Sequence, residues 1–321
     1  MHRHIMLGLL LATSMGMPHI QAQEKRTELT LQTLFIKVEA ANPGLKSKKE
    51  AVKSANSKRH QAGVFPNPEL ELESENMLGS GETQGFDAAE TTLKLSEKIE
   101  WGGKRKARQD AAELKYHYAS LEYDLTKQTL FLTAFDRYIN VISQGQLIAI
   151  SKEQKTLHQK FVKTVSKQVQ SGRLPQAELT RAEILLIKAS LDSEKSEYDY
   201  NKSLFRLSML WNEIGHSQPL GVERLPLPSH NLEELRVHSE DVFEHNLERK
   251  RIVNQLDQAK QNITLEKSLT SQDPVLSGGV KQNNSSNTTS FVAGIGFPLS
   301  LFDQNKGNIK AAQFQSKEWA H

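Results

Sequence analysis

The chain has 321 residues, of which 37% are hydrophobic and 25% are charged, and its mean hydropathy is −0.55. This length admits two domains, but the polarity is too high for two well-filled globular cores and favours long exposed helices. The formal net charge of +3 excludes a global basic field that would attract nucleic acid. The absence of cysteine excludes disulfides, thiolate zinc sites, iron–sulfur clusters and a cysteine nucleophile.

The start of the chain has the order of a secretory signal peptide over residues 1–22. Arg3 supplies the positive charge, residues 5–17 form a short apolar run, and Pro18 precedes the expected cut after Ala22. A buried N-terminal helix is the alternative. No stretch approaches the ~18 apolar residues that a spanning helix needs. We therefore expect an exported protein in which any membrane insertion uses β-strands.

The next part of the chain predicts one helix and two strands. Residues 27–63 have apolar residues three and four apart, which predicts a helix with a bend at Pro43. Residues 69–73 alternate Glu and Leu, which predicts a strand with one apolar face. A polar loop with three glycines leads to a second alternating strand at 93–99. The tryptophan and two glycines at 101–103 permit a sharp change from strand to helix.

Residues 104–170 contain no proline and predict one helix about 100 Å long. Its apolar residues follow a heptad pattern: Leu114, Tyr118, Leu121, Leu125, Leu132, Phe135, Ile139 and Ile142. After a turn at 171–175, a helix at 176–211 has a seam of mostly small residues: Ala182, Leu186, Ala189, Ser193, Ser196, Tyr200 and Leu207. The two shorter helices together match the long one in length, which predicts that they stack end to end beside it.

After a proline-containing linker at 216–230, the first pattern returns. Residues 232–269 are again helical, and Asp273-Pro274 takes the place of Asn67-Pro68 before a strand. A further strand is expected at 291–301, with one face formed by Phe291, Ala293, Ile295, Phe297, Leu299 and Leu301. This internal repeat divides the chain into a signal peptide (1–22), a first helix–strand–strand–helix–helix repeat (23–215), the linker (216–230) and a second repeat (231–321).

Exported coiled-coil rods joined by pairs of amphipathic strands resemble the TolC-type outer-membrane efflux family. Two segments resemble its cobalt–zinc–cadmium branch: Phe65-Pro66-Asn67-Pro68-Glu69-Leu70 and Glu100-Trp101-Gly102-Gly103-Lys104-Arg105-Lys106-Ala107-Arg108. The resemblance implies a mainly α fold with β, in which a long α-helical coiled-coil barrel continues a trimeric, twelve-stranded transmembrane β-barrel built from four amphipathic strands per protomer. Four strands cannot close a barrel, whereas twelve can.

The function that the resemblance implies is the channel of a tripartite pump–adaptor–channel system, which exports heavy-metal cations passively through a trimeric tunnel. Implied partners are two further copies of the chain, a periplasmic adaptor (membrane fusion protein), an inner-membrane resistance-nodulation-division pump and outer-membrane lipids, with no nucleic acid. The implied location is the Gram-negative outer membrane with a periplasmic extension. The second repeat ends about 95 residues short of an equal copy. We therefore expect a C-terminally incomplete chain that assembles poorly and leaks or fails to couple efflux.

Four acids on the first predicted strand, Glu69, Glu71, Glu73 and Glu75, are expected to line the channel lumen. If the intervening leucines face lipid, the carboxylates must face the lumen, because charge on the lipid face costs a few kcal/mol near mid-bilayer. Rings of such acids predict a preference for cations. The alternative is that a wet lumen merely requires polar residues.

The turn at Gly172-Arg173-Leu174-Pro175 lies at the far end of both long helices. By the family resemblance, this tip docks the adaptor's hairpin. Gly172 is expected to have a positive φ, which a bulkier residue would resist. The alternative is a plain helix–helix turn.

The predicted strand-to-helix interface comprises Trp101, Gly102, Gly103, Lys104 and Arg105. The basic run that continues through Lys106 and Arg108 is ordinarily an exposed helix start, and a nucleic-acid site is not expected in an exported protein. A further interpretation places Trp101 in an interfacial girdle, with the cations near lipid phosphates.

No catalytic, cofactor or metal site is expected. His216, His230, His238 and His245 gather near the linker. The spacing of His238 and His245 puts them on one helix face, as in a metal-binding pair, but no groups that would hold such ligands in place are evident, and a solvated face is the preferred interpretation. The sequence also lacks a phosphate-binding lysine in register with Gly294-Ile295-Gly296 and a nucleophile elbow, so no enzyme is predicted. The rival hypothesis is a periplasmic coiled-coil adaptor or structural scaffold, against which the repeated strand pairs argue.

Overall fold

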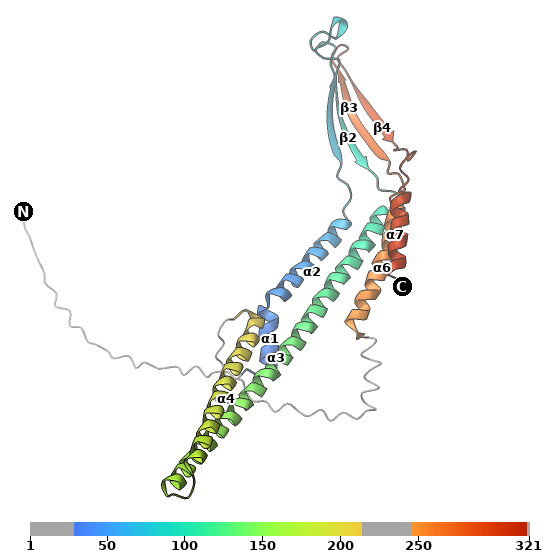
Figure 1. Ribbon diagram of the computed structural model, residues 1–321. Coiled ribbons are helices and arrows are strands. Elements are labelled where there is room, and N and C mark those ends of the chain that lie inside the picture. Colours follow the sequence, from blue (N-terminus) through green and yellow to red (C-terminus); the bar gives the residue numbers. More distant parts are fainter. Residues whose placement is uncertain (1–28, 214–244, 320–321) are drawn as a thin grey trace, which may run out of the picture.

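The computed structural model describes residues 29–213 and 245–319. The predicted signal peptide at 1–22 and the linker at 216–230 lie outside the described residues, as do His216, His230 and His238. The described chain forms an elongated helical rod with a β-sheet at one end (Figure 1).

The rod is built on α3 (Lys104–Gln170), whose bounds agree with the sequence prediction. The helix α4 (Gln176–Ser208) returns along its distal half, and the helices α1 (Leu31–Ala41) and α2 (Pro43–Ala62) lie along the half nearer the sheet (Figure 1). A short 3-10 turn, η2 (Met209–Trp211), follows α4 and contacts α1. The prediction that the shorter helices stack end to end beside the long one is confirmed.

The prediction of one bent helix over residues 27–63 is wrong, because the chain forms two helices separated at Asn42. The Asn42 backbone is extended, its Oδ1 accepts the Leu45 N–H at 3.0 Å, and its Nδ2 donates to the Leu210 carbonyl at 2.7 Å. Pro43 then occupies the first helical position, where its missing N–H costs nothing. Asn42 thus begins α2 and also holds η2, the turn that follows α4.

A buried core lies where α1, η2 and the middle of α3 meet. It consists of Leu29, Leu34, Val38, Ala134, Tyr138, Val141, Leu207, Leu210 and Trp211. Two of the heptad residues expected to pack here, Leu132 and Phe135, are instead 61% and 36% exposed. Both α1 and η2 pack against α3 in this region. The residues of α3 that are buried are therefore those that face these two elements, and they do not follow a single heptad pattern. The small seam of α4 is confirmed, since Ala182, Ala189, Ser193 and Leu207 are all buried.

The sheet is a four-stranded antiparallel meander. Its order is β1 (Glu69–Glu75), β2 (Glu90–Lys98), β3 (Val275–Asn283) and β4 (Thr288–Gly296). The strands of the two repeats meet where β2 pairs with β3.

The strand predicted at 291–301 ends early, at Gly296. Its partner there is Val275, the first residue of β3, so the residues beyond have no strand to pair with. Pro298 also lacks the N–H that a ladder needs. Phe297, Leu299 and Leu301 are therefore exposed residues beyond the end of the strand.

The second repeat adds α6 (Leu247–Ser268) and α7 (Lys306–Glu318). Glu122 of α3 joins the repeats, because it pairs with Lys48 of α2 at 2.9 Å and with Arg251 of α6 at 3.2 Å. Asn246 caps α6 by accepting the Arg249 N–H at 3.0 Å, as Asn42 caps α2. The order of elements thus repeats, while the domain boundaries stay a prediction. Among residues 29–213 and 245–319, none of the helices combines the length and the apolarity needed to cross a membrane.

Candidate channel-forming surfaces

One face of the sheet is apolar and uncovered. The register places Leu72 opposite Leu93, then Val280 and Phe291 across the next two strands. The large apolar side chains of this face are all exposed, by 39% to 90%: Leu70, Leu72, Leu93, Leu95, Leu276, Val280, Phe291 and Ile295. A sheet in water buries such a face against a second layer. This face has the character of a surface that contacts lipid.

The opposite face of the sheet is charged. Alternation along β1 gives Glu69, Glu71, Glu73 and Glu75 the same side of the sheet, and two of the four have lysine partners that the sequence did not reveal. Lys94 lies 2.7 Å from Glu71, and Lys281 lies 3.7 Å from Glu75 and also pairs with Glu90. Glu69 and Glu73 have no ion pair within the described residues. The lumen role of these acids stays a prediction. Glu69 and Glu73 are the strongest candidates for it, because no ion pair in the described part of the chain neutralises them.

Two glycines between β2 and α3 turn the chain from the sheet into the rod. Gly102 and Gly103 have φ of +69° and +75°, in the left-handed region that favours glycine. A Cβ on Gly102 would overlap the Ser271 side chain, so this glycine also lets the second repeat approach. Trp101 is 60% exposed, and its place at a lipid interface stays a prediction.

The sequence prediction of the strand-to-helix interface missed one residue, Asp273. This residue lies just before β3 and is only 6% exposed. Its Oδ1 accepts the Trp101 backbone N–H at 3.0 Å, and its Oδ2 lies 2.7 Å from Lys104 Nζ and 3.5 Å from Lys98 Nζ. Burial alone would raise the pKa of the Asp273 carboxyl, but the hydrogen bonds from Lys104 and Trp101 and the nearby charges outweigh it and lower that pKa. An acid before a strand-initiating proline was the only signal in the sequence.

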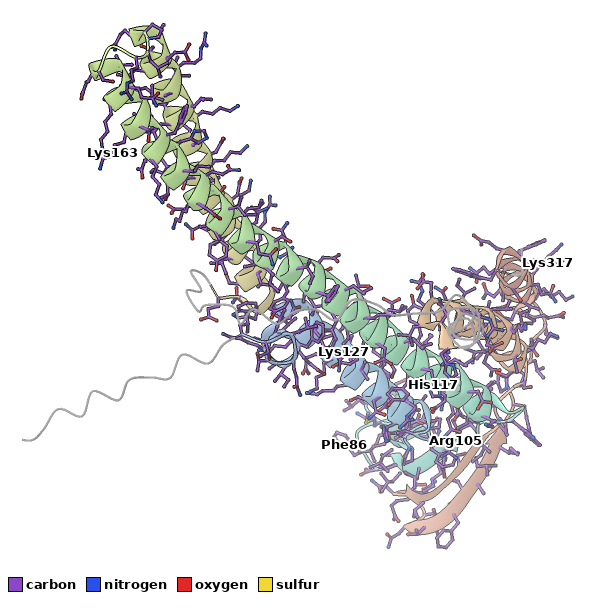
Figure 2. All side chains as sticks on the ribbon, turned by 90° about the horizontal axis from the view of Figure 1, so that it is seen from below. Phe86, Arg105, His117, Lys127, Lys163 and Lys317 are labelled. Atoms are coloured by element: carbon purple, nitrogen blue, oxygen red, sulfur yellow. The ribbon has the colours of Figure 1, made fainter. Side chains whose placement is uncertain are left out.

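Arg105 contacts the chain that leaves α2, at the sheet end of the rod (Figure 2). Its Nε donates to the Gly63 carbonyl at 2.7 Å, and its guanidinium carbon lies 3.9 Å from the ring centroid of Phe65. The expectation of an exposed helix start is therefore wrong for Arg105, and also for Lys104, whose side chain is only 11% exposed. It holds for Lys106, whose side chain is 75% exposed.

Arg108, one turn further along α3, contacts the chain that leaves α2 and also the residue Glu100 that follows β2. It donates to the carbonyls of Ala62 and Val64 at 2.8 and 3.1 Å and to both carboxylate oxygens of Glu100. The hydrogen bond from Arg108 lowers the pKa of the Glu100 carboxyl despite partial burial. The motif that suggested the heavy-metal branch thus supplies the residues that fix α2, β2 and α3 to one another.

The tip ends α3 in a compact turn. Gly172 has φ +73°, as predicted. Its N–H donates to the Val169 carbonyl at 2.9 Å, and the Arg173 N–H donates to the Gln168 carbonyl at 2.8 Å, which is the Schellman arrangement. Pro175 then caps α4 with an extended backbone. The docking role of Gly172, Arg173, Leu174 and Pro175 stays a prediction.

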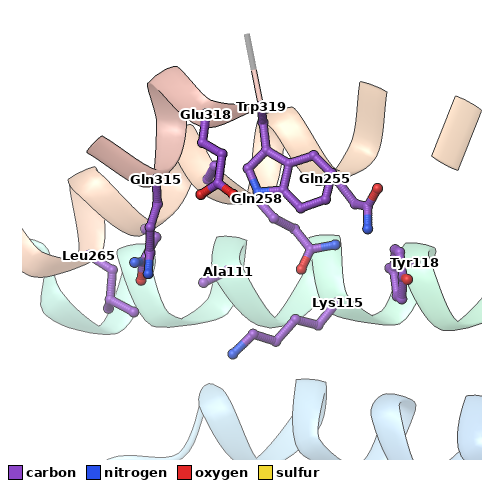
Figure 3. Close-up of a pocket in the computed structure, with 11 residues that line it drawn as sticks. Ala111, Lys115, Tyr118, Gln255, Gln258, Leu265, Gln315, Glu318 and Trp319 are labelled. Atoms are coloured by element: carbon purple, nitrogen blue, oxygen red, sulfur yellow. The ribbon is translucent and has the colours of Figure 1, made fainter. Parts of the chain in front are cut away.

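A groove of about 430 Å³ lies between α3, α6 and α7 (Figure 3). Its lining combines side-chain amides with one cation, Lys115, one acid, Glu318, and two aromatic rings, Tyr118 and Trp319. The described part of the chain contains no group of three His, Asp or Glu side chains placed to hold a metal ion. The candidate surfaces for function are the two faces of the sheet, its junction with the rod, and the tip.

Comparisons with known proteins agree with this arrangement. The family described as outer membrane efflux protein matches residues 34–213. The cobalt-zinc-cadmium resistance protein CzcC of Cupriavidus metallidurans is 24% identical over 308 residues, which cover 94% of this chain and 70% of CzcC. The nickel-cobalt-cadmium resistance protein NccC of Alcaligenes xylosoxydans xylosoxydans is 23% identical over 282 residues, which cover 81% of this chain and 58% of NccC.

Among solved structures, CusC has the same fold, with a TM-score of 0.69 at 18% identity over 91% of this chain and 71% of CusC. The outer membrane protein VceC of Vibrio cholerae gives a TM-score of 0.70 at 15% identity over 90% of this chain and 73% of VceC. The family match spans more than half of the chain, across the helical rod, the first strand pair and the tip. The chain therefore belongs to the outer membrane efflux protein family.

Proposed function

We propose that this chain is the outer-membrane channel of a tripartite efflux system that exports heavy-metal cations. The observation that carries the proposal is the sheet, with one uncovered apolar face and one charged face, at the end of a helical rod about 100 Å long. Such a sheet suits insertion into lipid, and the rod suits a conduit that extends away from it. The names of CzcC and NccC support heavy-metal cations as the exported substrate.

The working form is a homotrimer, because four strands cannot close a barrel and three copies supply twelve. The trimer spans the outer membrane of a Gram-negative cell after export by its signal peptide, and the rod extends into the periplasm. There it meets a periplasmic adaptor and an inner-membrane resistance-nodulation-division pump. The channel is passive and carries out no enzymatic reaction, because the pump supplies the energy.

Alkaline extraction of outer membranes tests the proposal against a periplasmic adaptor or scaffold. We expect the chain to remain in the membrane pellet at high pH together with other integral proteins. Release into the supernatant with peripheral proteins would contradict the channel and support the scaffold. Resistance to cobalt, zinc and cadmium, measured in a strain without its own channel, then tests the substrate separately.

A further inference from the structure

The distal part of α3 carries cations without acids. From residue 154 to residue 177 the sequence has five Lys or Arg residues and no Asp or Glu. Three of them, Lys160, Lys163 and Lys167, are exposed and lie three and four residues apart, so they form one stripe on the helix. Figure 2 shows Lys163 pointing away from the rod. Within the described ranges these three lysines have no acidic partner, and the nearest ion pairs join Lys152 with Glu197 and Arg181 with Glu178.

At the other end of the same helix, several cations form ion pairs with acids. Lys104 pairs with Asp273, Arg108 pairs with Glu100, and Lys127 pairs with Glu39. Like charges along one helix face repel each other by a few tenths of a kcal/mol per pair. These cations of α3 are therefore paired with acids of this chain, whereas, among the described residues, Lys160, Lys163 and Lys167 near the tip are not. A negatively charged partner would bind most favourably near the tip.

The lysine stripe (Lys160, Lys163 and Lys167) lies on a side of α3 that none of the described helices covers. Val165 is buried toward α4, while Leu157 and Phe161 form an exposed apolar stripe on a second side. Successive residues of a helix are about 100° apart around its axis. On this basis the lysine stripe lies roughly 150° from the buried side that Val165 marks and roughly 110° from the apolar stripe. In a closed ring of helices, α4 and the apolar stripe face neighbours, which leaves the lysine stripe on the wider, outer arc.

We propose that the lysine stripe is a docking surface for a protein helix that presents carboxylates at matching spacing. This inference rests on the proposed function, in which the occupant is the periplasmic adaptor that meets the rod near its tip. Complementary charge speeds encounter and fixes register, and contacts between exposed charges weaken as salt rises. The docking is therefore salt-sensitive and extends up the outside of the rod from the turn at Gly172.

Peptide binding to the full chain in detergent micelles tests the inference. The probe is a fluorescein-labelled alanine-based helical peptide with Glu at i, i+3 and i+7, compared with a peptide that has Gln at those positions. The test variant is Lys160→Gln/Lys163→Gln/Lys167→Gln. The matched control is Lys46→Gln/Lys49→Gln/Lys53→Gln, which removes three exposed lysines of the same spacing from α2. Circular dichroism checks that both variants remain helical.

We expect the chain to bind the Glu peptide at least about tenfold more tightly than the Gln peptide, with most of that preference lost in the test variant or at high salt. The control variant should stay within about twofold of the unsubstituted chain. Equal binding of both peptides, or an equal loss in both variants, would overturn the inference. Lysine-dependent binding to isolated murein sacculi without peptide binding would overturn it as well, because the occupant would then be an anionic glycan.

Failure of this inference is distinguishable from failure of the proposed function. If Lys160→Glu/Lys163→Glu/Lys167→Glu supports metal efflux and adaptor crosslinking as well as the unsubstituted chain does, the docking surface is wrong and the channel stands. If the chain binds the Glu peptide through the stripe but is extracted by alkali from outer membranes, the channel is wrong and the acidic-helix preference stands.

Discussion

The backbone N–H of Trp101, three residues after β2 ends, donates to Oδ1 of Asp273, just before β3, at 3.0 Å. The two residues are 172 positions apart and belong to different repeats. The same carboxylate pairs with Lys104 in the first turn of α3. The turn that leads the chain from the sheet into the rod is therefore fixed by a side chain of the other repeat.

Replacing Asp273 should destabilise this junction. Asp273→Ala leaves the Lys104 ammonium and the Trp101 N–H without their acceptor, which should lower the free energy of unfolding by about 2–4 kcal/mol. Asp273→Asn keeps an acceptor for Trp101 and should cost less. Urea unfolding followed by tryptophan fluorescence measures both, with exposed Glu153→Ala as the control. Equal stability of Asp273→Ala and the control would contradict the assignment.

The same carboxyl predicts a pH dependence. Its pKa is lower in the folded chain than its ordinary value of about 3.9, so its contribution to stability is complete above that value and is lost as pH falls through the folded pKa. The stability difference between the unsubstituted chain and Asp273→Asn should be constant from about pH 7 to pH 5 and shrink below about pH 4. A difference that grows on acidification would show that the sign is wrong.

Arg108 should not tolerate lysine. Its guanidinium serves two carbonyls and both oxygens of Glu100, and a single ammonium cannot reproduce this fork. Arg108→Lys should lower the free energy of unfolding by about 1–3 kcal/mol and expose the 63–68 segment to proteases. Exposed Lys106→Arg is the matched control. Proteolysis and unfolding of Arg108→Lys that match the unsubstituted chain would refute the clamp.

Gly172 is expected to be required at the tip only for its backbone conformation. A Cβ there meets nothing within 4 Å, but its φ of +73° costs a branched residue about 1–2 kcal/mol. Gly172→Val, in a hairpin grafted into the CzcC relative, should weaken adaptor crosslinking and metal resistance and leave the barrel in the membrane. Gly172→Asn should be close to unsubstituted, because Asn tolerates this conformation. Unchanged crosslinking and resistance in Gly172→Val would count against the docking role of the tip.

Ion selectivity should depend on which face of the sheet loses charge. Glu69 and Glu73 form no ion pair among the described residues, so Glu69→Gln/Glu73→Gln should reduce the cation preference measured by reversal potentials in planar bilayers. Glu97 lies opposite Leu276 in the register of β2 and β3, on the same face as the apolar residues, and provides the control. Glu97→Gln should leave the reversal potential unchanged. An anion preference in the unsubstituted channel would refute the lumen acids altogether.

The parts of this structure that were predictable from sequence are those with a long or strict period. The bounds of α3 followed from an uninterrupted helical pattern, and β1 and β2 followed from alternation. The break at Asn42, the early end of β4 and the burial of Asp273 depend on contacts between distant segments. No local pattern reports that Lys94 reaches Glu71 or that α1 and η2 meet on α3. The sequence therefore located the junction between sheet and rod but missed the residue that fixes it.

The claim that one face of the sheet contacts lipid is central to the account, and two neighbouring positions test it directly. The chain has no cysteine, so Leu72→Cys and Glu73→Cys each provide a single labelling site on opposite faces of β1. In outer membranes, a fluorophore at position 72 should be quenched by lipids with a quencher on the acyl chain and be protected from aqueous iodide. A fluorophore at position 73 should show the reverse. Equal iodide quenching at both positions would contradict the lipid-facing sheet and the channel built on it.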